Sequence, residues 1–336
     1  MSKMIWPKVI FGTSGLGNLY VAQTDAAKCS IVEACIYHSE KPVVFDTAGK
    51  YGAGLALESL GKSLRQLNIK PADVLISNKL GWLRTELKTP EPTFEPGVWR
   101  DLKHDAVQRI SYSGIIECYE QGNELLNGYK ADLVSVHDPD EYIDRGQSPA
   151  EKEKLYQDVL YAYHALQDLK QQKMVKAIGI GSKSWRVIEK VANDIDLDWV
   201  MIANSMTVHS HPAELVAFME KLKDKGIAII NSAVFNGGFL IGSDYYNYQP
   251  VNPVSHPELY QWRARFYELC AVYELQPAAV CAGFGLSAPG VVSIALNTTN
   301  QKRIAGNIAM ATDWIPSVFW ADMKEQGLMD TAYTHF

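Results

Sequence analysis

Four side chains that could together move a proton stand at or just beyond the ends of three short apolar runs. They are Asp46, Tyr51, Lys79 and His137. A tyrosine with an ordinary pKa of about 10 is a poor acid or base at neutral pH, but a neighbouring ammonium favours the phenolate. An imidazole can hydrogen-bond a substrate oxygen and help to pass the proton. We therefore predict Tyr51 as the acid/base, Lys79 as the cation that tunes it, Asp46 as the anchor of Lys79, and His137 as the group that orients the substrate.

Each of the four residues also has a structural interpretation when taken singly. Asp46 could cap the helix that follows it, and His137 could be a hydrogen-bonded core histidine. Tyr51 could be a half-buried loop aromatic, and Lys79 a solvated surface lysine. The combination at successive strand ends is what favours the catalytic interpretation.

The elements that must position these groups are eight apolar runs, each followed by apolar residues at helical spacing. The runs are 9–11, 43–45, 74–77, 133–136, 177–180, 199–203, 227–230 and 291–296. Eight such units in one chain predict an α/β fold, a (β/α)8 barrel in a single domain over residues 1–336, with reacting groups at the carboxyl ends of the strands. The stretches 81–104 and 232–257 are expected to be long, irregular connections.

A dinucleotide-binding open sheet with a second domain is the alternative fold. It would place G-x-G-x-x-G after the first strand, whereas this chain has glycines at 12, 15 and 17. The barrel is therefore the preferred prediction.

The composition excludes several classes of function. The formal net charge of -6 argues against a nucleic-acid partner. No run of about 18 apolar residues is available for a membrane span. The five cysteines form no C-x-x-C pair and no secretory signal begins the sequence, so we expect a soluble, cytoplasmic protein with reduced thiols.

The segments 45–48 (Phe-Asp-Thr-Ala) and 51–54 (Tyr-Gly-Ala-Gly), with Lys79 after Ile-Ser-Asn and His137 at a strand end, resemble the aldo-keto reductases. The similarity runs over nearly the whole chain. It implies a nicotinamide cofactor across the barrel mouth and stereospecific hydride transfer to or from a carbonyl carbon.

The same resemblance implies a set of cofactor-binding residues. They are Gly12, Thr13, Ser182, Asn204, Ser232, Phe235, Asn236, Gly238, Asn300 and Asn307. Asn204 or Ser205 would replace the family's usual glutamine, and 231–238 looks like the loop that wraps the pyrophosphate. After the last strand, basic residues for the 2′-phosphate of NADP are present only at Lys302 and Arg303, which favours NAD over NADP.

Within the family, the segments 198–207, 235–240 and 246–248 are most similar to the sugar dehydrogenases, which oxidise L-fucose, L-galactose and related aldoses at C1 to lactones. Pyridoxal dehydrogenase is a relative of that branch. The resemblance implies a small sugar or carbonyl substrate, and Trp82, Trp99 and Asp138 are candidates to contact it.

Three other functions stay open at this stage. One is an NADPH-dependent carbonyl reductase, and another is a non-catalytic nicotinamide-binding subunit. A metal-dependent hydrolase would use His209 and His211, but Gly12-Thr13-Ser14 stands where such barrels place His-x-His, so no metal is expected. The sequence makes no prediction of oligomeric state.

Overall fold

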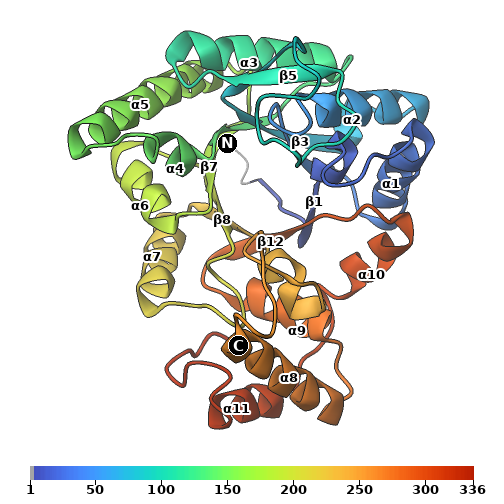
Figure 1. Ribbon diagram of the computed structural model, residues 1–336, viewed down its shortest axis with the longest axis vertical. Coiled ribbons are helices and arrows are strands. Elements are labelled where there is room, and N and C mark those ends of the chain that lie inside the picture. The colour runs from blue at the N-terminus through green and yellow to red at the C-terminus, as the bar shows by residue number, and fades with distance from the viewer. Residues whose placement is uncertain (1–3) are drawn as a thin grey trace.

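The structure, a computed structural model, describes residues 4–336, and within them eight parallel strands close into a barrel (Figure 1). Around the barrel the strands are β1 (Val9–Gly12), β12 (Val291–Leu296), β9 (Ala228–Ser232), β8 (Trp199–Ala203), β7 (Ala177–Ser182), β6 (Leu133–His137), β3 (Val74–Leu80) and β2 (Val43–Ala48). All eight strands and the predicted (β/α)8 fold are confirmed.

Helices surround the barrel, and Figure 1 shows α8 and α11 lying outside this ring, next to α9. The helices are α1 (Asp25–His38), α2 (Leu55–Gln66), α3 (Tyr112–Leu125), α4 (Pro139–Ile143), α5 (Pro149–Gln171), α6 (Trp185–Asp194), α7 (Ala213–Asp224), α8 (Pro257–Val272), α9 (Pro277–Ser287), α10 (Ile304–Ala309) and α11 (Ser317–Glu325). Side-chain oxygens of Thr24, Ser111 and Ser148 accept backbone N–H groups at the starts of α1, α3 and α5. These caps fix where each helix begins.

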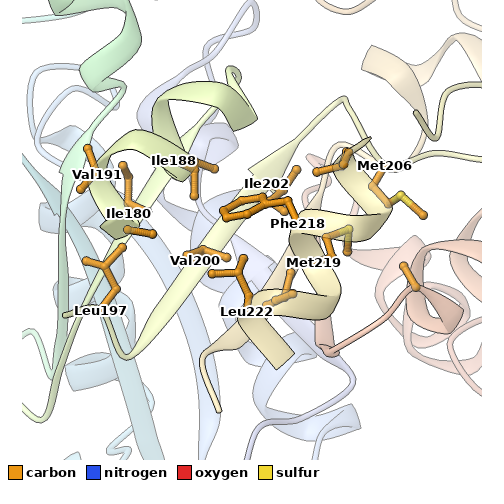
Figure 2. Packing of buried hydrophobic residues seen from close by; sticks show 14 of the residues in the cluster. Ile180, Ile188, Val191, Leu197, Val200, Ile202, Met206, Phe218, Met219 and Leu222 are labelled. Carbon is orange, nitrogen blue, oxygen red and sulfur yellow. The ribbon is translucent and has the colours of Figure 1, made fainter. Parts of the chain in front are cut away.

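The strands are buried on both faces. Figure 2 shows the outer side of β7 and β8, where Ile180 and Val200 pack against α6 and α7 through Ile188 and Phe218. On the inner side, a smaller cluster that includes Trp199 fills the barrel. The barrel is therefore a packed core, and an open site can form only at its mouth.

The stretch predicted as irregular between residues 81 and 104 departs from the prediction. It contains a strand β4 (Trp82–Glu86) paired antiparallel with β5 (His104–Gln108). The two strands are separated by a long loop, so no short turn marks the hairpin in the sequence. The second long connection holds the 3-10 helix η3 (Asn236–Ile241) and the short pair β10 (Tyr245–Tyr246) and β11 (Gln249–Pro250).

Two further findings bear on the expectations from composition. In residues 4–336 no single helix is long and apolar enough to cross a membrane. Helices α8 and α9 meet this criterion of length and composition only when taken together, and the angle between them is 98°. The five cysteines are free and buried, as expected for reduced thiols.

Candidate active site

The carboxyl ends of β2 and β3 bring Asp46 and Lys79 together. In the register of this pair, Asp46 lies opposite Ser77 and Ala48 opposite Lys79. The long lysine side chain reaches back along the strand, and its ammonium donates to a carboxylate oxygen of Asp46. Both side chains are about 5% exposed, so this is a buried ion pair.

A tight turn after β2 places Tyr51 over this ion pair. Two glycines let the turn lie against the 3-10 helix η1 (Ser14–Gly17), because a Cβ on Gly17 would be 2.8 Å from the carbonyl oxygen of Tyr51. Gly52 has a φ of +63°, which a glycine adopts without strain. Lys79 Nζ donates to the Tyr51 hydroxyl at 3.1 Å and lies 4.9 Å from the ring centre.

His137 completes the group from the end of β6. Its ring meets the ring of Tyr51 edge to face, with centres 5.5 Å apart and an interplanar angle of 85°. The four residues that were predicted from the sequence to transfer a proton together thus lie next to one another at the mouth of the barrel.

Burial is the largest single influence on the pKa values of Tyr51, Lys79 and His137. It raises the pKa of Tyr51, and the nearby Lys79 ammonium opposes that rise without overcoming it. Burial would lower the pKa of Lys79, but Asp46 and Tyr51 outweigh it and raise that pKa. Burial, reinforced by the Lys79 and Lys50 charges, holds the pKa of His137 well below its usual range. At neutral pH the site therefore holds a neutral phenol, a neutral imidazole and a charged lysine.

The predicted direction of the lysine's effect is confirmed, because the Lys79 ammonium lowers the pKa of Tyr51. Burial outweighs that effect, and the extent of burial could not be predicted from the sequence. A phenol of this kind can donate a proton to a developing alkoxide, and it becomes a base once its proton is lost.

Above Tyr51 lies a cavity of about 340 Å³ at the barrel mouth. Trp99 and Asp138, two of the predicted substrate contacts, line it together with Tyr51, Lys79 and His137. The indole of Trp99 lies 5.9 Å from the Tyr51 ring, centre to centre.

The third predicted substrate contact is placed elsewhere. Trp82 is buried beneath the mouth, where it packs against Phe94 at 5.8 Å between ring centres, and it is absent from the cavity lining. Trp82 begins β4, and the hairpin turns its side chain toward the cluster formed with Ala53 and Phe94.

The predicted cofactor residues divide into three groups, of which the first faces the mouth. Ser182 and Ser232 line the cavity from the ends of β7 and β9. Asn204 follows β8 with a φ of +63°, and its buried side-chain oxygen has no hydrogen-bond partner within residues 4–336. Between these groups, Gly181 leaves the floor flat, because a Cβ there would contact Lys79 and Met201 at 3.6 and 3.7 Å.

The second group lies outside the cavity lining, and its side chains are engaged within the protein, as the hydroxyls of Ser182 and Ser232 also are. The hydroxyl of Thr13 donates to the backbone oxygen of Asp46 at 3.0 Å. The fully buried amide of Asn236 donates to the backbone oxygen of Asn204 at 3.2 Å and to Asn247 Oδ1 at 2.8 Å. Asn300 Oδ1 accepts the backbone N–H of Lys302 at 3.0 Å. The side chains of these three residues shape the mouth, so their contacts with a cofactor would come mainly from their backbone atoms.

The third group consists of the remaining four predicted residues, which lie outside the cavity lining. Gly12 ends β1, and Gly238 has a φ of +95° in η3. Phe235 packs into the hydrophobic core, and Asn307 is half-buried on α10. The cavity lining includes none of these four.

These features fit a nicotinamide cofactor. A buried amide oxygen without a partner, two serine hydroxyls and a flat glycine floor surround one side of the cavity. Ser182, Asn204 and Ser232 would hold the carboxamide end, and the backbone of the loop with Gly238 would approach the phosphates.

Sequence reasoning missed a set of charged and aromatic residues at the mouth. They are Lys50, Glu95, Glu141, Lys183 and Tyr248. Lys50 and Lys183 are next to the predicted Tyr51 and Ser182, and this adjacency was a signal in the sequence. Burial raises the pKa of Tyr248 to about 12, so its phenol is neutral at the rim.

The two histidines considered as metal ligands have other partners. His209 Nδ1 lies 2.9 Å from the Tyr246 hydroxyl, and His211 Nδ1 lies 3.1 Å from the backbone oxygen of Thr207. No group of three or more His, Cys, Asp or Glu side chains in residues 4–336 is arranged to hold a metal ion. Pro212 directly follows His211 and precedes α7.

Known proteins are similar to the chain over most of its length. The chain is 26% identical to pyridoxal 4-dehydrogenase of Microbacterium luteolum, with 95% of this chain and 93% of that protein covered. It is also 26% identical to D-threo-aldose 1-dehydrogenase of a Pseudomonas species, covering 97% and 95%. L-galactose dehydrogenase of Arabidopsis thaliana is 22% identical, covering 90% and 83%.

Solved structures share the fold. A glycerol dehydrogenase from Gluconobacter oxydans superposes with a TM-score of 0.69 at 15% identity, covering 99% of this chain and 98% of that one. An aldo-keto reductase from Bacillus halodurans in its holo form gives 0.67 at 17% identity, covering 97% and 93%. The sequence profile of the aldo/keto reductase family matches residues 8–325. With this match over most of its length, the chain belongs to the aldo/keto reductase family.

Proposed function

We propose that this oxidoreductase is an aldose 1-dehydrogenase, which oxidises an L-fucose- or L-galactose-like sugar at C1 to the lactone with NAD or NADP. The observation that carries the proposal is the Asp46–Lys79–Tyr51 hydrogen-bonded series beside His137 at the base of an open cavity. Relatives named as aldose and galactose dehydrogenases support the substrate class.

In the proposed reaction, Tyr51 in its phenolate form accepts the proton of the C1 hydroxyl while the C1–H bond breaks. A bound nicotinamide would supply the acceptor for the hydride and its two electrons. The C1–O bond becomes the lactone carbonyl, and the ring oxygen stays in place. Lys79 stabilises the phenolate form of Tyr51, and Asp46 holds Lys79 beside it. Neutral His137 forms one hydrogen bond with the substrate oxygen, which orients C1 for the transfer.

The cavity walls suit a neutral sugar ring. Trp99 offers an apolar face, which can pack against the C–H side of a pyranose. Asp138 follows His137 and lines the same cavity, where its carboxylate can accept hydrogen bonds from sugar hydroxyls.

For the cofactor, we propose NAD in preference to NADP. Asn300 uses its side-chain oxygen to cap the turn that contains Lys302, and Lys302 and Arg303 are exposed. Five free, buried cysteines support a reducing compartment such as the cytoplasm.

One observation favours a second candidate, an NADPH-dependent carbonyl reductase. Burial raises the pKa of Tyr51, so the resting site holds a proton donor, which is the form that carbonyl reduction requires. The two candidates use the same residues and differ in the favoured direction and cofactor.

The test is a cofactor-reduction assay with the purified chain, NAD or NADP, and a panel of L-fucose, L-galactose, D-arabinose and pyridoxal. Reduced cofactor with an aldose, and a lactone as product, is the expected result. Oxidation of NADPH by simple aldehydes without any aldose oxidation would favour the reductase. Cofactor binding with no turnover in either direction would contradict both and favour a non-catalytic nicotinamide-binding subunit.

A further inference from the structure

A cluster of charged side chains stands beside Tyr51, and only Asp138 among them has a role in the reaction described so far. We call it the Lys50 cluster, and its members are Lys50, Glu95, Asp138, Glu141 and Lys183. The Lys50 ammonium lies 2.8 Å from Glu95 Oε1, 2.9 Å from Glu141 Oε2 and 3.8 Å from Asp138 Oδ2. Lys183 joins Glu141 from the end of β7.

Lys50 is the buried centre of this cluster, with a side chain only 5% exposed. Burial alone would lower the pKa of Lys50, but Glu95, Asp138 and Glu141 outweigh that effect and raise it. The lysine therefore stays charged and connects three separate segments: the turn that carries Tyr51, the long loop between β4 and β5, and the start of α4. Such a buried, multiply paired lysine restrains the segments that it joins.

Glu95 connects the cluster to the cavity wall. One carboxylate oxygen accepts from Lys50, and the other accepts the indole N–H of Trp99 at 2.7 Å. Glu95 also has a φ of +45°, an unfavourable conformation for a residue with a side chain. Strain of this kind persists where surrounding contacts impose it, and these two contacts supply such a constraint.

The orientation of Trp99 matters because its indole stands over the catalytic phenol. The ring centres of Trp99 and Tyr51 are 5.9 Å apart, and the planes are inclined by 36°. The backbone of the loop is held by an isolated bridge between Leu19 and Trp99. That bridge places the backbone of Trp99. Its side chain is oriented by the hydrogen bond to Glu95 together with packing against Phe94, whose ring centre lies 6.5 Å away.

We propose that Glu95 and Lys50 are positioning residues that hold the Trp99 indole as the wall against which the apolar face of a ring-form aldose packs, so that they determine affinity for the sugar without taking part in the chemistry. This inference rests on the proposed aldose 1-dehydrogenase function. A preoriented aromatic wall binds a sugar ring without the entropic cost of ordering it in each binding event.

The critical variant is Glu95→Gln, because an amide keeps the shape of the side chain but has a single acceptor oxygen for two donors. Glu91→Gln is the matched control, since Glu91 is exposed in the same loop and loses the same charge. With the aldose that the wild-type chain oxidises fastest, Glu95→Gln should raise KM about tenfold, the effect typical of losing a hydrogen bond to a charged group. The kcat value and the Kd for the oxidised cofactor should stay within about twofold, and Glu91→Gln should change none of the three.

A double-mutant cycle with Trp99→Phe tests whether Glu95 acts through the indole. Because phenylalanine has no N–H for Glu95 to accept, Glu95→Gln should raise KM by less than about twofold in that background. The same tenfold rise in both backgrounds would overturn the proposal, as would equal losses in KM, kcat and cofactor binding. Failure of the wild-type chain to oxidise any aldose would overturn the proposed function and this inference together, and it is seen before any variant is made.

Discussion

Replacement of Lys79 by methionine separates two roles of the buried ion pair. Lys79 and Asp46 are each about 5% exposed, and the ammonium also donates to Tyr51 at 3.1 Å. Methionine matches the length of the lysine chain but leaves the Asp46 carboxylate buried without its counter-ion. Removing one partner of a buried pair typically costs about 3–5 kcal/mol of unfolding free energy.

Catalysis should fall by a separate mechanism. Lys79 makes the largest contribution that lowers the pKa of Tyr51, against the burial that raises it. Its loss leaves burial unopposed, so the phenolate becomes scarcer and the hydroxyl loses its donor. We expect kcat/KM for aldose oxidation to fall by about 10²–10⁴, the usual range for impaired general acid/base catalysis.

The double variant Asp46→Asn/Lys79→Met distinguishes the two effects. Since neither charge is left unpaired, its unfolding free energy should recover to within about 1–2 kcal/mol of wild type, while activity stays low. The assays are urea unfolding and initial rates of cofactor reduction, with Lys88→Met, at an exposed loop position, as the control. Recovery of activity together with stability would contradict a catalytic role for Lys79, because the lysine would then matter only for folding.

Three further predictions concern pH and cofactor choice. Because burial raises the pKa of Tyr51 above the ordinary value of about 10, aldose oxidation should increase with pH without levelling off below that pH. Carbonyl reduction should be level and fall only at the alkaline end. Initial rates in both directions measure this, and an oxidation rate that falls from about pH 7 upward would contradict it. Burial raises the pKa of Asp138 from 3.8 to about 6, so the unfolded chain loses this proton at a lower pH than the folded chain. The unfolding free energy should therefore decline by up to about 3 kcal/mol as the pH rises from about 4 to about 6. Unfolding free energies of Asp138→Asn should lack that part of the decline, and an identical pH profile for variant and wild type would exclude it. Lys302→Ala/Arg303→Ala should leave the Kd for NAD within about twofold, and a loss of NADP affinity above about tenfold would show that these side chains do bind a 2′-phosphate.

The sequence predicts the barrel well because its strands carry a strong local signal. Parallel strands covered on both faces are continuous apolar runs, and the polar residue that ends each run must lie at the mouth. Asp46, Lys79 and His137 follow from this rule alone, since closure of the barrel brings successive strand ends together.

Features that depend on contacts between distant loops could not be predicted in this way. Strands β4 and β5 pair across a long loop, and Trp82 is turned beneath the mouth by that pairing. The contacts of Lys50 with Glu95 and Glu141 join segments that lie 45 and 91 residues apart in the numbering of the chain. No periodicity or turn signal encodes such pairs. The raised pKa of Tyr51 was missed for a similar reason, because desolvation depends on the packing of the whole mouth.

The most direct test of the account follows the hydrogen on C1 of the sugar. An aldose labelled with deuterium at C1 is oxidised by the purified chain, and the reduced cofactor and the product are analysed by mass spectrometry. If the sugar is oxidised at C1 with Tyr51 as the base, the deuterium appears in the reduced nicotinamide and the product is an unlabelled lactone. Tyr51→Phe should remove most of this transfer while still binding the cofactor. Deuterium retained in the product, or full transfer by Tyr51→Phe, would contradict oxidation at C1 with Tyr51 as the base.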